Sequence, residues 1–272
     1  MQSIKYCETS KLTDTTYVVK AALPCRFAKP RVGQFLIVAT QNTERIPVTP
    51  LWLEEAEGKI HFIVEVVGAS TYQFIEDLKN GLSITSLMKA GKPNNLHGKI
   101  LFIVSPIAVG VASYAIQNSD IKDYYLVVAS RSEKYRSIYS YLTNFISENK
   151  SFFHCDQDRN LSKTLGELKD TISFSPDIVM LAGSPSMMRF SFETLKTVFP
   201  NSKFVASLNP IMLDGTGMCG ACRVEVAGEV KFACKDGPDF LAEDINWDNL
   251  IERQKFYTSE EEEAKRQLIL EN

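Results

Sequence analysis

The sequence lacks the features of a membrane protein or of a nucleic-acid-binding protein. Its 272 residues include 30 Lys and Arg against 33 Asp and Glu, so there is no basic excess to bind a phosphate backbone. The longest unbroken apolar stretches, such as residues 100–104, are far too short to span a bilayer. The first residues mix Lys5, Glu8 and Lys11 with other residue types and contain no apolar secretory segment. We therefore expect a cytoplasmic protein that binds neither nucleic acid nor membrane.

Histidine and cysteine are also scarce. None of the three histidines lies in a pattern typical of a metal ligand or a general base, and we predict no catalytic side chain. Six cysteines in 272 residues, without a secretory segment, do not resemble the disulfide framework of a small secreted domain. Cys7, Cys25 and Cys155 stand alone and are expected to be small buried side chains.

The other three cysteines follow the spacing of an iron–sulfur protein. Plant-type [2Fe–2S] proteins use C-x4-C-x2-C and a distant fourth cysteine. Cys219 and Cys222 supply the C-x2-C pair, and Cys234 follows after eleven intervening residues. The position of the first cysteine in this pattern holds Asp214, whose carboxylate can also ligate iron.

The residues around these positions suit a loop that wraps a metal cluster. Gly215, Gly217 and Gly220 tolerate positive φ and let backbone N–H groups approach the sulfurs. Residues 223–232 alternate apolar and polar side chains, as in a hairpin that would return Cys234 to the loop. A structural zinc site is the alternative, because zinc also takes three cysteines and a carboxylate. The four-residue offset and the glycines favour the iron–sulfur cluster.

Residues 207–240 resemble the iron–sulfur end of a family of electron-transfer subunits. The family includes the alpha (small) subunit of NADH-dependent ferredoxin:NADP oxidoreductase and the corresponding subunit of dihydroorotate dehydrogenase. In the ferredoxin:NADP group one aspartate and three cysteines hold a [2Fe–2S] cluster, whereas the dihydroorotate relatives use four cysteines. The resemblance therefore implies that the cluster ligands are Asp214, Cys219, Cys222 and Cys234.

The first 97 residues contain short runs of β-branched and aromatic residues separated by Gly, Pro and Asn. This pattern predicts a small antiparallel β-barrel with one helix. The expected strands cover residues 15–23, 34–39, 60–67 and 82–85, and the expected helix covers residues 71–79.

Residues 44–49 resemble the arginine-containing strand of ferredoxin-reductase-type flavin domains. In those domains the arginine pairs with the FAD diphosphate, and a Ser or Thr hydroxyl lies near the flavin N5. A diphosphate favours a planar, permanently charged donor. The resemblance implies that Arg45 binds the diphosphate, that Thr49 contacts the flavin ring, and that Pro47 and Val48 belong to the same site.

Two further segments match the flavin domains in the same order. Residues 32–35, VGQF, resemble their P-G-Q-F segment. Gly68, Ser70 and Thr71 open the expected helix with hydroxyls and free N–H groups that suit a phosphate. The usual G-P-L-G turn is replaced by residues 87–92, LMKAGK. The arginine strand alone would more simply be an exposed strand end, but the three matches together favour FAD.

Residues 98–207 alternate apolar runs of strand length with segments of helical spacing. This alternation predicts a parallel sheet covered on both faces, which binds ligands beyond the carboxyl ends of its strands. The expected strands cover residues 100–104, 124–129, 151–155, 178–182 and 203–207, and the expected helices cover residues 107–118, 134–149, 161–168 and 187–199.

The turns after these strands resemble a nicotinamide-dinucleotide site, with one departure. Gly183 and Met187 match a G-P-x-x-M-M segment beside the nicotinamide, and Arg131 matches a G-x-R turn associated with the dinucleotide. The glycine-rich turn G-G-G-x-G-x-A-P of the family reads SPIAVGVA at residues 105–112, which keeps Gly110. Side chains there would fill space that glycines leave empty. Either the loop binds NAD(H) or NADP(H) in an altered way, or this subunit has lost the site.

The C-terminal end shows two helical patterns, at residues 248–255 and 259–270. Ser259 and the three glutamates after it resemble a capped, solvated helix start. We thus expect a multi-domain, ferredoxin-reductase-like chain. Its parts are an FAD-binding antiparallel barrel at residues 1–97, an NAD(P)-binding-like α/β domain at residues 98–207, and a [2Fe–2S] module with C-terminal helices at residues 208–272.

The resemblance implies an oxidoreductase subunit in which a nicotinamide nucleotide, FAD and a [2Fe–2S] cluster carry the chemistry. It also implies a larger partner, similar to the small chain of glutamate synthase, with its own FAD and [4Fe–4S] clusters, through which ferredoxin is reduced. Two alternatives stay open. One is an electron-transfer subunit for a dihydroorotate- or sulfide-dehydrogenase-type partner. The other is a zinc-stabilised, non-enzymatic subunit that has lost nucleotide binding.

Overall fold

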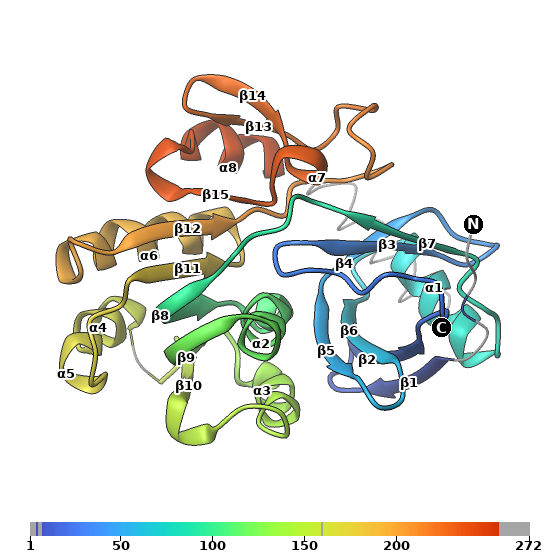
Figure 1. Cartoon of the computed structure of the whole chain (residues 1–272), viewed down its shortest axis with the longest axis horizontal. Helices are drawn as coiled ribbons and strands as arrows, with labels where there is room; N and C mark the ends of the chain where they lie inside the picture. Colours follow the sequence, from blue (N-terminus) through green and yellow to red (C-terminus); the bar gives the residue numbers. More distant parts are fainter. Residues whose placement is uncertain (1–3, 5–6, 159, 256–272) are drawn as a thin grey trace.

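Two antiparallel sheets and a helix form the N-terminal part of the chain (Figure 1). The structure, a computed structural model, describes residue 4, residues 7–158 and residues 160–255. The elements of this part are β1 (Cys7–Lys11), β2 (Thr16–Ala22), β3 (Phe35–Ala39), β4 (Ile46–Val48), β5 (Pro50–Glu54), β6 (Lys59–Glu65), α1 (Ala69–Lys79) and β7 (Ser86–Ala90). The strand orders are β1-β2-β6-β5 and β4-β3-β7.

The core of this part forms where β-branched and aromatic residues are concentrated. β2 and β6 pair antiparallel, and the opposed Val19 and Phe62 are fully buried. Helix α1, as predicted, covers the core with Phe74 and Leu78, which lie on one helix face at i, i+4 spacing. It ends before Gly81, whose φ of 79° suits a helix stop.

The strand predicted at residues 82–85 is wrong. In that segment Ile84 makes an isolated bridge to Ile4, and the strand follows as β7, where Phe35 of β3 pairs with Ala90. Because Gly81 ends the helix, residues 82–85 serve as the connection that brings the chain to the second sheet. Residues 87–92, which replace the usual G-P-L-G turn, therefore lie mostly in β7.

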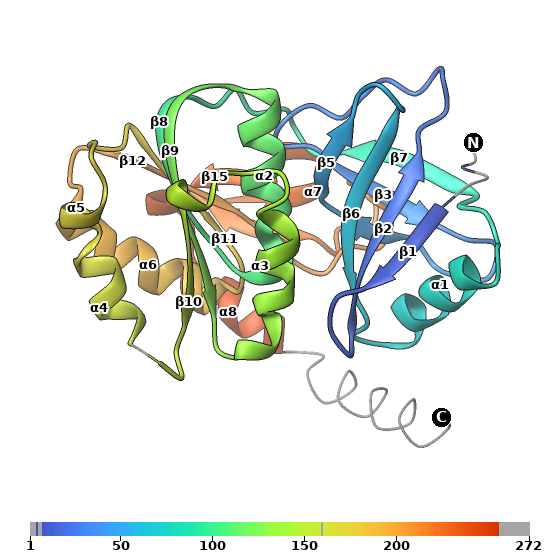
Figure 2. The same cartoon turned by 90° about the horizontal axis from the view of Figure 1, so that it is seen from below.

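A parallel sheet flanked by helices forms the middle of the chain, as predicted. Its elements are β8 (His97–Val104), α2 (Val109–Asn118), β9 (Asp120–Ser130), α3 (Arg136–Leu142), β10 (Ser151–Cys155), α4 (Leu161–Gly166), α5 (Leu168–Thr171), β11 (Ile178–Ala182), α6 (Pro185–Val198) and β12 (Lys203–Ser207). The five strands pair in parallel in the order β10-β9-β8-β11-β12. Figure 2 shows α2 and α3 on the face toward the antiparallel sheets and α4 to α6 on the other face.

The helix predicted at residues 134–149 is shorter than expected, because α3 ends at Leu142. Beyond this end, side chains take up backbone carbonyl groups of the last turn. Thr143 Oγ1 donates to the carbonyl of Ser140, and Asn144 Nδ2 donates to the carbonyl of Tyr141. Such bonds compete with helix propagation, which explains the early stop.

The C-terminal module adds a hairpin, a strand and a helix. Its elements are β13 (Arg223–Val226), β14 (Glu229–Phe232), α7 (Ala233–Asp236), β15 (Asp239–Leu241) and α8 (Trp247–Lys255). The predicted hairpin is confirmed, and its turn residues Ala227 and Gly228 have φ of 51° and 74°. The helix predicted at residues 248–255 is α8, while the one predicted at 259–270 lies outside the described residues.

Strand β15, which the sequence did not predict, joins the module to the parallel sheet. It pairs antiparallel with β12 and makes the sheet six-stranded. On the other side, the N–H groups of Gly91 and Lys92 donate to the carbonyls of Cys234 and Gly237 at 2.8 and 2.5 Å. The module therefore bridges the two larger parts, across the top of Figure 1. We keep the boundaries 1–97, 98–207 and 208–272 as a proposal.

Helix α2 packs directly on β5, an edge strand of the first antiparallel sheet. Gln117 donates to the carbonyl of Leu53 at 2.6 Å and accepts from its N–H at 2.8 Å. Ser113 Oγ donates to the carbonyl of Leu51 at 2.7 Å. Side chains of the nucleotide-binding-like part thus satisfy backbone groups that a strand edge otherwise leaves open.

The isolated cysteines differ from expectation at one position. Cys155 is buried and Cys7 is partly buried, but Cys25 is exposed, because it lies in a turn after β2. In the part of the chain that the structure describes, no helix combines the length and apolar character needed to cross a membrane.

Gly110 tests the packing of α2 on β5. A Cβ at this position would lie 2.7 Å from the carbonyl oxygen of Pro50, whereas a Cβ at Gly166 in α4 would meet nothing within 4 Å. We expect Gly110→Ala to lower the free energy of unfolding by about 1–3 kcal/mol, as overpacking does. The control Gly166→Ala should be neutral or stabilising by up to about 1 kcal/mol. Equal urea-unfolding midpoints for the two variants would contradict the close contact.

Candidate functional site

Two of the four predicted metal ligands lie side by side in the interior. The sulfur atoms of Cys222 and Cys234 are 3.2 Å apart, and both side chains are buried. Two thiolates bound to one tetrahedral metal ion at about 2.3 Å would lie about 3.8 Å apart. Burial raises the pKa of the Cys234 thiol to about 12. The two sulfur atoms are closer than two ligands of one metal ion, and a small outward movement would bring them to that spacing.

The other two predicted ligands are linked through the backbone. The carboxylate of Asp214 accepts from the N–H of Thr216 at 2.8 Å and from the N–H of Cys219 at 2.9 Å. The hydrogen bond from the Thr216 N–H lowers the pKa of Asp214 to about 2. Cys219 is exposed. The thiols of Cys222 and Cys234 thus form a buried pair, and the carboxylate of Asp214 is held by the backbone of the loop that carries Cys219.

The loop lies against the second antiparallel sheet. Gly215 has a φ of 72°, and a Cβ there would meet Ile37 of β3 at 2.7 Å. Arg45, which precedes β4, donates to the backbone carbonyl of Asp214 at 3.5 Å. The predicted metal loop therefore contacts the strand that is expected to hold a flavin, although the two are far apart in sequence.

A cavity of about 320 Å³ opens where the three parts of the chain meet. Pro47, Val48 and Thr49 line it from the antiparallel sheets, and Gly110 and Gly183 line it from the parallel-sheet part. Residues that follow or end β8, β11 and β12 form one wall, as expected for a ligand site at the carboxyl ends of parallel strands. Its volume lies at the lower end of the range of small-molecule sites.

A second cavity, of about 730 Å³, lies over the ends of β9 and β10. Arg131 and Met187 line it, as predicted for a dinucleotide site. Ser105 and Ile107 line both cavities, so the segment that replaces the glycine-rich turn lies between them. Its side chains occupy the turn, and open space remains on both sides of it.

Three predicted residues at the start of α1 do not line either cavity. Thr71 Oγ1 accepts from the N–H groups of Val67 and Gly68 at 2.9 and 3.2 Å, so this hydroxyl caps its own helix. A Cβ at Gly68 would meet nothing within 4 Å, which leaves the start of α1 open to the surface. Ser70 lies in the same turn. The phosphate role of these residues stays a prediction.

The sequence reasoning missed the residues that the C-terminal module adds to the first cavity. Asn209, Met212 and Asp239 line it beside Ser207 at the end of β12. No motif marks these positions. Asn209 and Met212 follow β12 directly, whereas Asp239 reaches the cavity through the pairing of β15 with β12, and a three-residue strand gives little periodic signal.

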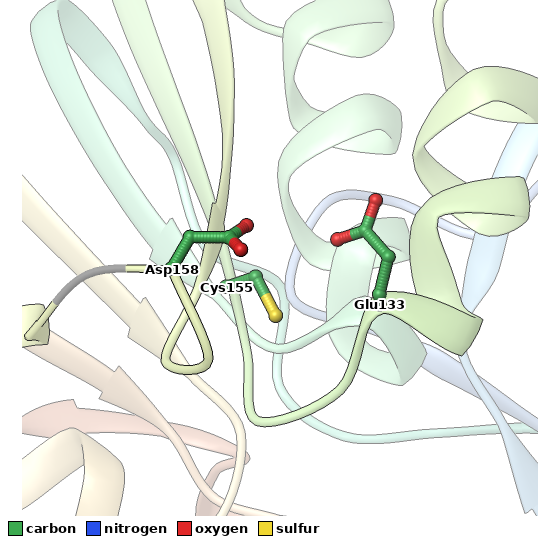
Figure 3. Close-up of side chains that lie close together, drawn as sticks. All are labelled: Glu133, Cys155 and Asp158. Atoms are coloured by element: carbon green, nitrogen blue, oxygen red, sulfur yellow. The ribbon is translucent and has the colours of Figure 1, made fainter.

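A separate acidic group lies near the end of β10. Figure 3 shows Glu133, Cys155 and Asp158, whose ligand atoms lie within 4.8 Å of one another. Arg136 already forms an ion pair with Glu133, and the two carboxylates are exposed. We assign no metal to this group.

Comparisons with known proteins agree with the geometry. Residues 209–246 match the family model described as the iron-sulfur cluster binding domain of dihydroorotate dehydrogenase B. A Thermotoga maritima protein named dihydroorotate dehydrogenase B (NAD(+)), electron transfer subunit homolog is 31% identical over 85% of this chain and 83% of its own.

Solved structures show the same fold. The structure of an NADH-dependent reduced ferredoxin-NADP oxidoreductase matches with a TM-score of 0.77 and 26% identity, over 99% of each chain. Phthalate dioxygenase reductase, at 13% identity, matches with a TM-score of 0.57 over 83% of this chain and 86% of its own. The expected ferredoxin-reductase-like fold is confirmed. The chain belongs to the family of dihydroorotate dehydrogenase B electron-transfer subunits.

Proposed function

We propose that the chain is the small, flavin- and iron–sulfur-containing subunit of a ferredoxin:NAD(P) oxidoreductase. As a member of its family it is an electron-transfer subunit of an oxidoreductase, and FAD, a [2Fe–2S] cluster and a nicotinamide nucleotide are its cofactors. The observation that carries the finer assignment is Asp214 paired with Cys219 in the metal loop, next to the buried pair of Cys222 and Cys234. The structural match to the ferredoxin-NADP enzyme over 99% of the chain supports the same assignment.

The donor set fits a [2Fe–2S] cluster. In such clusters each iron takes two protein ligands, so the ligands divide into two pairs. A single zinc ion would instead need all four donors to converge on one point. In the described part of the chain, the one group of three donors within 4.8 Å lies elsewhere, at Cys155. Bound by Asp214, Cys219, Cys222 and Cys234, the cluster would accept and pass on single electrons.

The first cavity fits the ring system of FAD. Bound there, FAD would take up two electrons together and release them one at a time. Thr49 would contact the ring from the antiparallel sheets, and Arg45 would hold the diphosphate outside the cavity. Arg45 also donates to the backbone of Asp214, so it would couple the position of the diphosphate to that of the metal loop. The largely apolar lining, with Val48 and Met180, would exclude water from the ring.

The second cavity fits the part of a nicotinamide nucleotide that carries the phosphates. Arg131 offers a cation for a phosphate, and Met187 and Gly183 follow the end of β11 beside the first cavity. Because open space remains on both sides of Ser105 and Ile107, we favour retained nucleotide binding over loss of the site.

The partner is part of the proposal. We propose a larger subunit similar to the small chain of glutamate synthase, with its own FAD and [4Fe–4S] clusters, through which ferredoxin is reduced. The similarity to a Thermotoga maritima dihydroorotate dehydrogenase B subunit homolog supports a second candidate, an electron-transfer subunit for a dihydroorotate-type dehydrogenase. Purification of the native complex separates the two, because the second candidate requires a dihydroorotate-oxidising partner.

Anaerobic purification with iron, zinc and flavin measured is the direct test of the function. We expect two irons and one FAD per chain, and bleaching of the flavin absorbance by NADH or NADPH. Zinc without iron, together with no flavin, would favour the non-enzymatic alternative. Iron and FAD without bleaching at millimolar nucleotide would mean that the altered loop no longer binds a dinucleotide.

Substitutions of Asp214 separate ligation from backbone capping. Asp214→Cys should keep two irons but change the absorption and EPR spectra, because a thiolate replaces an oxygen ligand. Thr216 and Cys219 donate to different oxygens of Asp214, so Asp214→Asn can accept from only one of them and also loses the charge, and we expect it to lose iron. Asp214→Asn with the iron content and spectra of the wild type would show that the side chain only caps the loop. Cys25→Ser, which changes an exposed cysteine elsewhere, should leave the iron content unchanged.

Arg45 tests the diphosphate assignment. We expect Arg45→Ala to weaken FAD binding at least about tenfold, since charge-assisted hydrogen bonds to phosphate are among the stronger ones. Arg45→Lys should restore part of the affinity, because a point charge replaces a planar fork. FAD release into the ultrafiltrate, measured by fluorescence, gives the affinity. Arg26→Ala, at an exposed arginine elsewhere in the chain, serves as the control, and an equal loss in both variants would speak against a specific role.

A further inference from the structure

Asp239 is an isolated carboxyl group in the first cavity. Of the described residues that line this cavity, it is the only carboxylic acid, and none is Lys, Arg or His. Tyr114 is the other ionisable group there, and its hydroxyl already donates to the carbonyl of Pro30 at 2.8 Å. A single carboxyl group in an otherwise uncharged cavity calls for a specific partner.

One oxygen of Asp239 has a partner and the other has none. Asn94 Nδ2 donates to Oδ2 at 3.0 Å. Oδ1 is buried and has no hydrogen-bond partner among the described residues. Burial raises the pKa of Asp239, and the hydrogen bond from Asn94 and the nearby Ser207 hydroxyl act in the opposite direction. A donor from a ligand would offset the cost of burying Oδ1 and would favour the charged form of the group.

A purely structural role of Asp239 explains the hydrogen bond to Oδ2 but not the unpaired Oδ1. Asn94 lies between β7 and β8, so its bond to Asp239 fastens the C-terminal module to the connection between the larger parts. That fastening uses Oδ2 and leaves Oδ1 unexplained. Since Asp239 stands opposite Ser207 at the carboxyl end of β12, it lies at the sheet edge where ligands of parallel sheets bind.

We propose that Oδ1 of Asp239 accepts a hydrogen bond from the carboxamide N–H of a nicotinamide ring in the first cavity. The inference rests on the proposed function, because it requires a nicotinamide nucleotide to reach this cavity. The carboxamide is the ring substituent that carries N–H donors, and Gly183 and Ser184 line the same wall after β11. Such a bond would fix the orientation of the ring in its plane. The imide N–H of the flavin ring has similar chemistry, and the test separates the two sources.

The test compares NAD⁺ with an analogue in which an acetyl group replaces the carboxamide, using the full-length, FAD- and iron-loaded protein under anaerobic conditions. Calorimetry gives the dissociation constants. We expect the wild type to prefer NAD⁺ over the analogue by about tenfold, the scale of one hydrogen bond to a charged group. Asp239→Ala should bind NAD⁺ about tenfold more weakly and should no longer distinguish the two ligands. Asp239→Asn, which keeps an acceptor oxygen, should recover part of the preference.

Asn94→Ala is the matched control, because it removes the fastening bond and leaves Oδ1 in place. It should bind NAD⁺ like the wild type, and all variants should retain FAD equally when the released flavin is measured by fluorescence. Equal losses of NAD⁺ affinity in Asn94→Ala and Asp239→Ala would overturn the proposal in favour of a structural role. Loss of FAD alone in Asp239→Ala would overturn it in favour of the flavin imide.

Failure of the inference is distinguishable from failure of the proposed function. Protein that contains neither FAD nor iron would contradict the function itself. Fully loaded wild-type protein that does not bind NAD⁺, or binds the analogue equally well, would overturn the role of Asp239 and leave the electron-transfer assignment standing.

Discussion

The backbone hydrogen bonds from Gly91 and Lys92 to Cys234 and Gly237 hold the site together. They fix the end of the hairpin that carries Cys234 against the strand that leaves the antiparallel sheets. The same segment continues directly into β15, whose pairing with β12 fixes it to the parallel sheet. Since main-chain bonds made in two directions leave the segment little freedom, the buried cysteine pair and the first cavity share one rigid support.

The placement of the metal loop has a consequence for electron transfer. Gly215 packs on Ile37, and Arg45 reaches the carbonyl of Asp214, so the loop and the proposed flavin strand touch. With FAD and the cluster bound at the proposed sites, this contact would bring the two cofactors near each other. In the proposed function the chain would act as a scaffold for its cofactors, and its side chains would contribute position and exclusion of water more than acid–base chemistry.

Much of the fold follows from patterns in the sequence, and the exceptions have physical reasons. Strands β10, β11 and β12 have the predicted bounds. Of these, β11 is buried throughout, as expected of a continuous apolar strand that is covered on both faces. The predicted strand at residues 82–85 and the long helix at residues 134–149 were wrong, because local bonding at Gly81 and Asn144 overrode residue propensity. Motif spacing indicated the metal loop and the residues Thr49 and Met187.

What the sequence could not indicate are contacts made by pairing between distant segments. Asp239 lies at the first cavity only because it pairs with Ser207 when β15 adds to β12. The two residues are 32 positions apart, and no local sequence pattern predicts which residues of such distant strands will pair. The surroundings of the altered turn at Ser105 were also not predictable from the sequence. Its residues predict crowding, but the cavities on either side depend on how β9 and β11 end around it.

The contact between α2 and β5 bears on how the first part of the chain would behave alone. Gln117 and Ser113 cover the polar backbone edge of β5, which a separated barrel would present to solvent. Unshielded edges invite strand addition between molecules. The nucleotide-binding-like part thus protects its neighbour from self-association, and a fragment that ends near residue 97 would be expected to oligomerise rather than remain a soluble monomer.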